Sequence, residues 1–323
     1  MDYASLESEG IYRLPISTPF PVGKVNIYFV VSAILTLIDT PPRGPLYLYE
    51  LEDALNRIGY SIRDIERVII THPHIDHFGL ASTISEKSGA ELWVFKGAIE
   101  RFKNFEKKAV KNIDFLTSVL KRSRVPEEIV DYSRKILYDA KGFGCELEPS
   151  KSLEDGENIR LSDRTFNVIH VPGHTPWCIL LYNIEKGLAF AGDFLLKDIS
   201  SNALIQKPSY VPEGYKSLKC YISSLKRVRD LGVEVALPGH GEIIVNPLER
   251  VDELLSFIES RKEDVLSVIR RGAKTVFQIV EVLFPSLPHN QLWLAVSEVI
   301  GYIELLEDEG FIENRKRGFI YVS

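Results

Sequence analysis

The sequence predicts an α+β protein in which two β-sheets pack face to face, with helices on their outer sides. Short apolar segments of strand length alternate with amphipathic segments of helical length. Several of these apolar segments end in a histidine or an aspartate close to glycine or proline, a pattern typical of turns at the end of a strand. The 323-residue chain is 45% hydrophobic and 26% charged, which indicates a globular protein with a large core.

The N-terminal part of the chain carries the pattern for the first sheet. Residues 10–40 contain segments of alternating apolar and polar side chains, which predict antiparallel strands. Residues 47–58 place leucines at helical spacing, and a second helix is expected over residues 80–87. Apolar segments at residues 68–70 and 91–95 read as further strands. Strands and helices mixed in this way favour two packed sheets with helices outside.

The stretch that follows the strand at residues 68–70 holds the densest group of potential metal ligands. His72 and His74 are two residues apart, so in an extended segment their side chains leave on the same side and can reach one ion. Asp76 and His77 come after a turn and can face a second ion. Histidines also cap helices or lie satisfied in a core, but three imidazoles and a carboxylate within six residues favour a transition-metal site.

Three later segments repeat this pattern. His174 lies on a Pro/Gly turn, Asp193 ends an apolar segment, and His240 lies between two glycines after another apolar segment. One such motif is weak evidence for a metal. Four apolar segments that each end in a histidine or an aspartate predict a shared metal centre.

Taken in their order along the chain, the four motifs resemble those of the metallo-beta-lactamase superfamily, and the resemblance covers most of residues 10–245. The resemblance implies an αββα four-layer sandwich and two divalent metal ions. In the implied ligand set, His72, His74 and His174 bind the first ion, Asp76, His77 and His240 bind the second, and Asp193 bridges them. Asp76 is also the candidate catalytic residue.

Two positions indicate which subgroup of the superfamily the chain resembles. Asp193 stands where the true lactamases have a cysteine ligand, so the resemblance argues against antibiotic hydrolysis and favours the subgroup similar to glyoxalase II, lactonases and nucleases. The third motif continues as Trp177–Cys178, where the family often has Gly-His or Gly-Ser, so the local wall of the pocket is expected to differ.

The implied metal pair predicts the type of reaction. Two ions about 3.5–4 Å apart can share a water and lower its pKa to about 7, which supplies a metal-bridging hydroxide at neutral pH. Zinc is the expected element, although histidine and carboxylate ligands also suit iron and manganese. The predicted function is hydrolysis of a small ester, thioester or lactone, with a small-molecule acyl compound as substrate. An endoribonuclease or phosphodiesterase acting on RNA is the alternative, and a binding protein without turnover is a third hypothesis.

Two segments are candidates for selecting the substrate. Residues 98–145 predict a helical insertion rich in lysine and arginine, which acts either as a lid or as an amphipathic insertion that packs on the scaffold. Its basic residues favour a solvated face over a phosphate clamp. Residues 195–215 lack periodicity and follow a ligand-bearing strand, so they are expected to line the cleft. The candidate substrate contacts are Lys197, Asn202 and Tyr210.

The C-terminal quarter, residues 249–323, is expected to form its own unit after a catalytic domain at residues 1–248. Helices are predicted at 249–270, 276–284 and 291–309, followed by a hairpin with a basic tip. This order resembles a winged helix, and some superfamily members that carry one are endoribonucleases. Acidic residues outnumber basic ones by 13 to 9 in this unit, and the whole chain has a net charge of −6, which argues against nucleic-acid binding.

The remaining features concern location and isolated residues. No apolar run approaches the roughly 20 residues needed to cross a membrane, and the N-terminus shows no signal pattern. Three scattered cysteines predict free thiols, so a cytoplasmic location is expected. The acidic, apolar tail is compatible with a homodimer. His170 is expected to support the ligands, Cys178 to be a small buried residue, and His289 to be exposed.

Overall fold

The computed structural model describes residues 3–315 and 318–321, and two six-stranded sheets dominate it. The first sheet contains β1 (Ile11–Ile16), β2 (Val25–Val30), β3 (Thr36–Ile38), β4 (Arg67–Ile70), β5 (Glu91–Phe95) and β6 (Lys151–Leu153), in that spatial order. The second contains β7 (Asn158–Leu161), β8 (Arg164–His170), β9 (Ile179–Asn183), β10 (Leu188–Gly192), β11 (Val235–Pro238) and β12 (Ile244–Val245), with β12 and β7 at its edges. The predicted pair of sheets is therefore confirmed.

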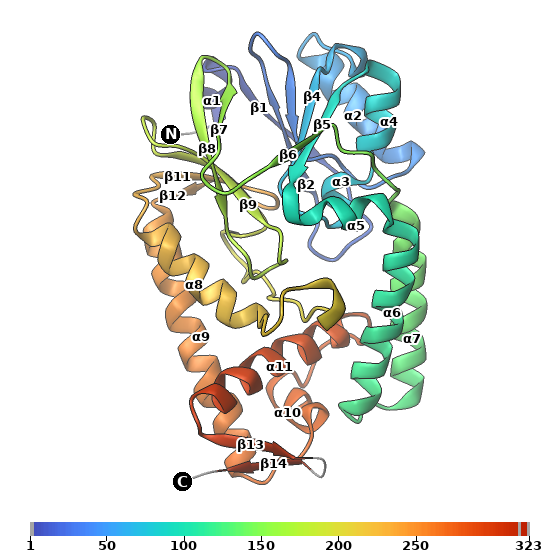
Figure 1. The fold of residues 1–323 in the computed structure, drawn as a ribbon, viewed down its shortest axis with the longest axis vertical. Helices are drawn as coiled ribbons and strands as arrows, with labels where there is room; N and C mark the ends of the chain where they lie inside the picture. The colour runs from blue at the N-terminus through green and yellow to red at the C-terminus, as the bar shows by residue number, and fades with distance from the viewer. Residues whose placement is uncertain (1–2, 316–317, 322–323) are drawn as a thin grey trace.

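Helices pack beside the first sheet, and two long helices extend downward from the second (Figure 1). The helices α2 (Pro45–Arg57) and α4 (Ala81–Ser88) share a core with β4 and β5, whereas α8 (Ser217–Arg229) and α9 (Pro247–Arg270) share one with β9 and β10. A third cluster fills the space between the sheets, where the rings of Tyr28 and Phe190 lie 5.4 Å apart. Of these helices, only α8 lies in a segment for which the sequence pattern predicted no helix.

Strand direction decides where the ligand-bearing loops emerge. The strands β3 to β6 run parallel to one another, and β8, β10 and β11 share one direction because β8 and β10 are both antiparallel to β9. Parallel strands place their carboxyl ends at one edge of a sheet. Backbone hydrogen bonds join the two edges, from Ile179 N to Thr71 O at 2.9 Å and from Asn26 N to Gly239 O at 2.7 Å.

The predicted helical insertion contains α5 (Ile99–Lys103), α6 (Phe105–Arg122) and α7 (Glu127–Ala140), and Asn104 separates α5 from α6. Figure 1 shows the α6–α7 hairpin reaching along one side of the molecule to the C-terminal helices. Val119 and Leu120 are buried in the same core as those helices. The insertion is therefore not a free solvated arm. Its basic side chains are mostly exposed, as predicted, and Lys121 forms an ion pair with Glu127 at 2.6 Å.

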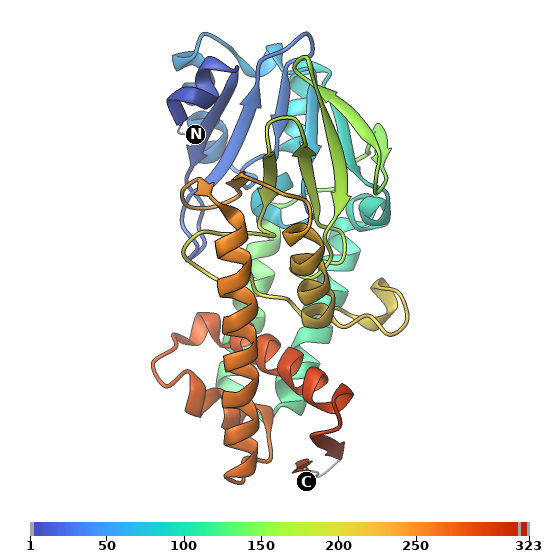
Figure 2. The ribbon, with the colours of Figure 1, turned by 90° about the vertical axis from the view of Figure 1, so that its left-hand side faces the viewer.

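The C-terminal unit contains the predicted elements: α9, then α10 (Val276–Leu283), α11 (Leu292–Asp308), β13 (Ile312–Arg315) and β14 (Gly318–Tyr321). A capping box of Thr275 and Gln278 opens α10. Two residues of the basic tip, Lys316 and Arg317, lie outside the described residues. Figure 2 shows α8 beside α9, the long helix that leads from the second sheet into the rest of this unit. Because α8, α9 and α11 share one core with that sheet, the boundary at residue 248 and the winged-helix assignment stay predictions.

Two smaller helices complete the fold, α1 (Tyr3–Ser8) beside β1 and α3 (Ile75–Phe78) after β4. Within the described ranges, every helix is too short or too polar to pass through a lipid bilayer.

A carboxyl group on α11 makes stability depend on pH. Glu304 lines a cleft of about 1230 Å³ between the insertion, residues 205–217 and the C-terminal helices. Burial raises the pKa of Glu304 from 4.5 to about 7; the charge of Lys216 opposes the change and that of Glu307 adds to it. The folded chain therefore holds a proton that the unfolded chain releases. The resulting stability is complete below about pH 4.5 and is lost as pH rises through 7.

We expect Glu304→Gln to raise the free energy of unfolding at pH 8 by about 1–2 kcal/mol, after a discount for partial exposure, and to change it little at pH 4.5. Urea denaturation at the two pH values measures this difference. The control is Glu281→Gln, an exposed glutamate on α10. Equal effects of Glu304→Gln at both pH values would contradict the assignment of the raised pKa.

Candidate metal centre

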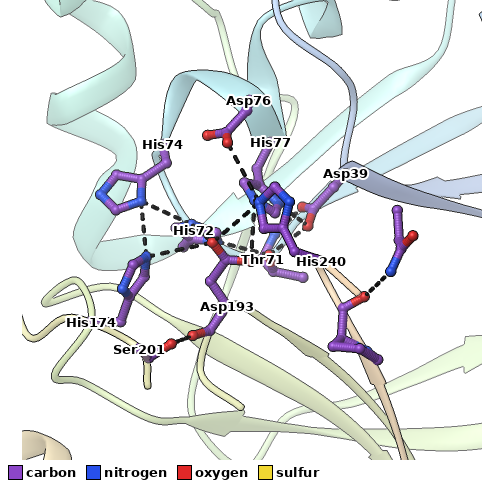
Figure 3. Close-up of polar contacts among 12 residues, drawn as sticks. Asp39, Thr71, His72, His74, Asp76, His77, His174, Asp193, Ser201 and His240 are labelled. Carbon is purple, nitrogen blue, oxygen red and sulfur yellow. Dashed lines mark hydrogen bonds and ion pairs between the residues drawn. The ribbon is translucent and has the colours of Figure 1, made fainter. Parts of the chain in front are cut away.

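The seven predicted ligands converge at the edge where the two sheets are joined, and their side chains point toward one another (Figure 3). They come from four loops, each at the carboxyl end of a strand. His72 and His74 lie in the extended segment after β4, Asp76 and His77 lie on α3, His174 follows β8, Asp193 follows β10, and His240 follows β11. The spacing argument for His72 and His74 is consistent with this arrangement, because the helical turn begins only after His74.

The first group consists of His72, His74, His174 and Asp193, whose ligand atoms lie within 4.8 Å of one another. His74 Nδ1 lies 3.2 Å from His72 Nε2 and 2.9 Å from His174 Nε2. Asp193 Oδ2 lies 3.9 Å from His72 Nε2 and 3.8 Å from His174 Nε2. Burial lowers the pKa of His74 to about 3 and also lowers the pKa values of His72 and His174, so the three imidazoles are neutral at physiological pH.

The second group consists of Asp76, His77 and His240, again within 4.8 Å. His240 Nε2 lies 3.3 Å from His77 Nε2 and 3.5 Å from Asp76 Oδ2. Asp193 reaches this group too, with Oδ1 3.3 Å from His77 Nε2 and Oδ2 3.5 Å from His240 Nε2. Asp193 thus contacts both groups.

Charge is distributed differently in the second group. Burial acts to lower the pKa of His77, but the charges of Asp193 and Asp39 outweigh it and raise this pKa well above its ordinary value. Burial acts to raise the pKa of Asp76, but the hydrogen bond from His240 and the charge of His77 hold it low. Asp76 and Asp193 are therefore ionised at neutral pH.

The donor set fits a divalent transition metal. The Nδ1 atoms of His77, His174 and His240 each face an oxygen at 2.8–3.0 Å, so Nδ1 keeps its hydrogen, and each Nε2, once deprotonated, presents its lone pair to the cluster. Asp193 Oδ1 is closed off from solvent and lacks a hydrogen bond among the described residues. Inward-facing imidazole nitrogens around an incompletely bonded carboxylate are what a zinc-type ion requires.

Two glycines allow the ligand loops to come this close. A Cβ on Gly239 would lie 2.3 Å from Asp193 Oδ1 and 2.6 Å from His77 Cε1. Gly192 has a φ of +48°, and a Cβ there would lie 2.5 Å from Thr71 Oγ1. A side chain at Gly239 would displace Asp193 and His77, and one at Gly192 would displace Thr71, which precedes His72.

The sequence model of the metallo-beta-lactamase superfamily matches residues 20–240. The chain belongs to this superfamily. It is 29% identical over 317 residues to the probable metallo-hydrolase YqjP of Bacillus subtilis (strain 168), with 97% of each chain covered. It is 28% identical over 209 residues to the acyl-coenzyme A thioesterase MBLAC2 of Bos taurus, covering 61% of this chain and 64% of the relative. The crystal structure of a metallo-beta-lactamase family protein from Thermus thermophilus superposes with a TM-score of 0.83 at 27% identity, covering 97% of this chain and 99% of the other.

Asp39 is a further site residue of this superfamily member, and the sequence reasoning missed it. Asp39 Oδ2 accepts hydrogen bonds from His77 Nδ1 at 2.8 Å and from Thr71 Oγ1 at 2.7 Å, while Oδ1 accepts one from Thr71 N at 2.7 Å. These bonds orient His77. The signal was present, because Asp39 ends the apolar strand β3 in the way Asp193 ends β10.

Main-chain oxygens orient two other histidines. His174 Nδ1 donates to Asn202 O at 3.0 Å, and His240 Nδ1 donates to Lys24 O at 2.8 Å. His170 supports the site indirectly, as expected, because it lies 2.8 Å from Pro176 O and stacks on Phe95 beside the turn that carries His174.

The remaining single-residue predictions are resolved by burial. Cys178 is 2% exposed and its Sγ accepts a hydrogen bond from Thr175 N, while burial raises the pKa of its thiol to about 12. It is therefore a small buried residue, as predicted, and has little thiolate character. His289 is exposed, as expected.

The three candidate substrate contacts lie in different surroundings. Lys197 is exposed on the segment after Asp193. The Asn202 amide donates to Leu294 O at 3.1 Å, so its side chain is directed at α11 while its main chain holds His174. The Tyr210 hydroxyl is buried. Their roles toward a substrate stay predictions.

Proposed function

We propose that this chain is a dinuclear metal-dependent hydrolase of thioesters, within the glyoxalase II-like part of the superfamily. The observation that carries the proposal is Asp193, whose carboxylate contacts two separate groups of imidazole and carboxylate ligands. A relative named acyl-coenzyme A thioesterase supports thioesters over the other acyl compounds considered. The expected substrate is a small acyl molecule, and the expected location is the cytoplasm.

The metal assignment follows from the donor set. In the proposal, His72, His74 and His174 hold one ion, Asp76, His77 and His240 hold the other, and both share Asp193. When bound, such ions polarise the thioester carbonyl and lower the pKa of water. Zinc is the proposed element because imidazole nitrogens predominate, although iron and manganese share these ligands.

The protein side chains contribute charge and orientation. Asp39 and the main-chain oxygens of Asn202 and Lys24 hold three imidazoles in one tautomer, with Nε2 toward the cluster. The carboxylates of Asp76 and Asp193 are ionised at neutral pH and place negative charge beside the imidazoles. Asp76 is the proposed catalytic side chain because it lies at the edge of the second group, near His240.

The endoribonuclease alternative is less well supported. Phosphate binding requires lysine and arginine that are free to pair with a backbone. In the insertion, acidic side chains already lie within ion-pair distance of Lys103, Lys108 and Lys121. We assign the C-terminal unit, proposed to be a winged-helix domain at residues 249–323, a packing role in preference to RNA binding, because its helices share a core with α8 and the second sheet.

Metal removal tests the proposal directly. Chelation is expected to abolish thioester hydrolysis, and zinc is expected to restore it as about two ions per chain rebind. Elemental analysis of the purified protein and assays on thioester, ester, lactone and RNA substrates measure this. The His289→Ala variant is the control, because its side chain is exposed on the C-terminal unit. Full thioesterase activity in verified metal-free protein would overturn the proposal.

A further inference from the structure

Arg101 on α5 is a half-buried cation with one buried nitrogen that has no hydrogen-bond partner among the described residues. Its Nη1 nitrogen is closed off from solvent and lacks a hydrogen-bond partner among the residues described. Burial lowers the pKa of Arg101; Tyr210 opposes this effect, and no carboxylate in the described ranges contributes to it. The guanidinium carbon lies 5.8 Å from the centre of the Phe105 ring, an apolar neighbour. Because an unpaired buried charge is costly, this arrangement indicates a partner that comes from outside the chain.

Tyr210 offers a second unpaired donor from a different segment. Its hydroxyl is buried and has no hydrogen-bond partner in the described part of the chain. The positive charge of Arg101 acts to lower the pKa of Tyr210, so the two groups lie within electrostatic range. Burial outweighs this effect and raises the pKa, which keeps Tyr210 an O–H donor at neutral pH. Lys207 Nζ lies 5.2 Å from the centre of the Tyr210 ring and adds positive charge.

Each segment is linked to elements that carry candidate metal ligands, α5 by packing and the Tyr210 segment by chain continuity. The helix α5 packs on α3, which carries Asp76 and His77, because the rings of Phe102 and Phe78 lie 5.1 Å apart. Tyr210 belongs to the segment that leaves the centre at Asp193. In Figures 1 and 2, the gold turn that ends at Tyr210 lies below α5 on the same side of the molecule.

We propose that Arg101 and Tyr210 form a subsite that binds a carboxylate or phosphate of the substrate beside the metal centre. The inference rests on the proposed thioesterase function and specifies it: the preferred thioesters carry an anionic group. A guanidinium binds either anion through parallel N–H···O bonds, and the phenol hydroxyl adds a third donor. The anion would complete hydrogen bonds that the described residues leave unmade.

Kinetics with three thioesters of one acyl group test this subsite. Acyl-coenzyme A carries phosphates, acylglutathione carries carboxylates, and the acyl-N-acetylcysteamine thioester is neutral. We expect Arg101→Gln to raise KM about 10- to 100-fold for whichever charged thioester the wild type prefers and to leave KM for the neutral one unchanged. Tyr210→Phe should have a smaller effect of the same kind, and Arg101→Lys should retain part of the preference. The control is Arg63→Gln, an exposed arginine on the turn at residues 62–64.

A binding measurement gives a readout independent of turnover. Calorimetric titration of metal-depleted protein with free coenzyme A and with glutathione measures binding alone. The Arg101→Gln variant should bind the preferred thiol more weakly than the wild type, by a factor similar to the rise in KM. An equal rise in KM for charged and neutral thioesters would indicate a merely structural role and overturn the subsite. The subsite would also be overturned if the wild-type protein hydrolysed all three thioesters with equal KM. If zinc-loaded wild type hydrolyses none of them, the proposed function itself fails. Thermal unfolding identifies a variant that does not fold. If Arg101→Gln does not fold, the KM values of Tyr210→Phe decide whether the subsite exists.

Discussion

Replacing Asp193 with alanine is expected to lower kcat/KM for thioester hydrolysis by about 10³-fold or more, because metal assistance supplies several kcal/mol of transition-state stabilisation. Asp193 is the carboxylate that contacts both ligand groups, within 3.3–3.9 Å of four histidines. Without it, four inward-facing imidazoles lose their shared negative partner, and metal occupancy should fall with activity. Steady-state assays combined with elemental analysis of the same samples measure both effects.

A companion variant and a matched control make this result specific. His74→Ala removes a ligand of the first group only and should also remove most activity. Asp198→Ala changes an exposed carboxylate five residues beyond Asp193 and should behave as wild type. Unchanged turnover in both Asp193→Ala and His74→Ala would rule out the proposed site.

Asp39→Asn is expected to weaken metal binding by about 10- to 100-fold, the usual effect of losing a group that orients a metal ligand. Asp39 accepts three hydrogen bonds, one from His77 Nδ1 and two from Thr71. An amide can replace the accepting oxygen but removes the negative charge that favours His77 as a ligand. Competition with a chelating dye measures the affinity.

The same variant distinguishes orientation from direct ligation. Because Asp39 acts through His77, saturating zinc should restore much of the activity of Asp39→Asn, whereas Asp193→Ala should not recover. The control is Asp131→Asn, an exposed aspartate on α7. Wild-type zinc affinity in Asp39→Asn would mean that the hydrogen bonds of Asp39 are not needed to position His77.

Local sequence patterns were sufficient to predict the ligands that lie close together along the chain. The two-residue spacing of His72 and His74 and the turn before Asp76 depend on backbone geometry within a few residues. The helix stop at Gly89, which has a φ of +80°, and the capping box at Thr275 are equally local. Such features follow from the conformational limits of the residues themselves.

Long-range contacts could not be derived in this way. Asp39 bonds to His77 across 38 residues, and its sequence signal, an aspartate after a short, mostly apolar strand, is common. The burial of Val119 and Leu120 depends on helices more than 150 residues later in the chain, so the insertion could not be identified as part of that core. The role of Asn202 was also hidden, because its main chain, and not its amide, holds His174.

The sequence by itself determined the superfamily, the two-sheet fold and the seven candidate ligands, because each depends on short-range patterns of apolar and polar residues. Only the tertiary structure decided which atoms face one another, that Asp193 lies between two ligand groups, and that Arg101 Nη1 and the Tyr210 hydroxyl are buried without hydrogen-bond partners among the described residues. Burial and partner geometry are properties of segments brought together from distant parts of the chain, and no local pattern encodes them.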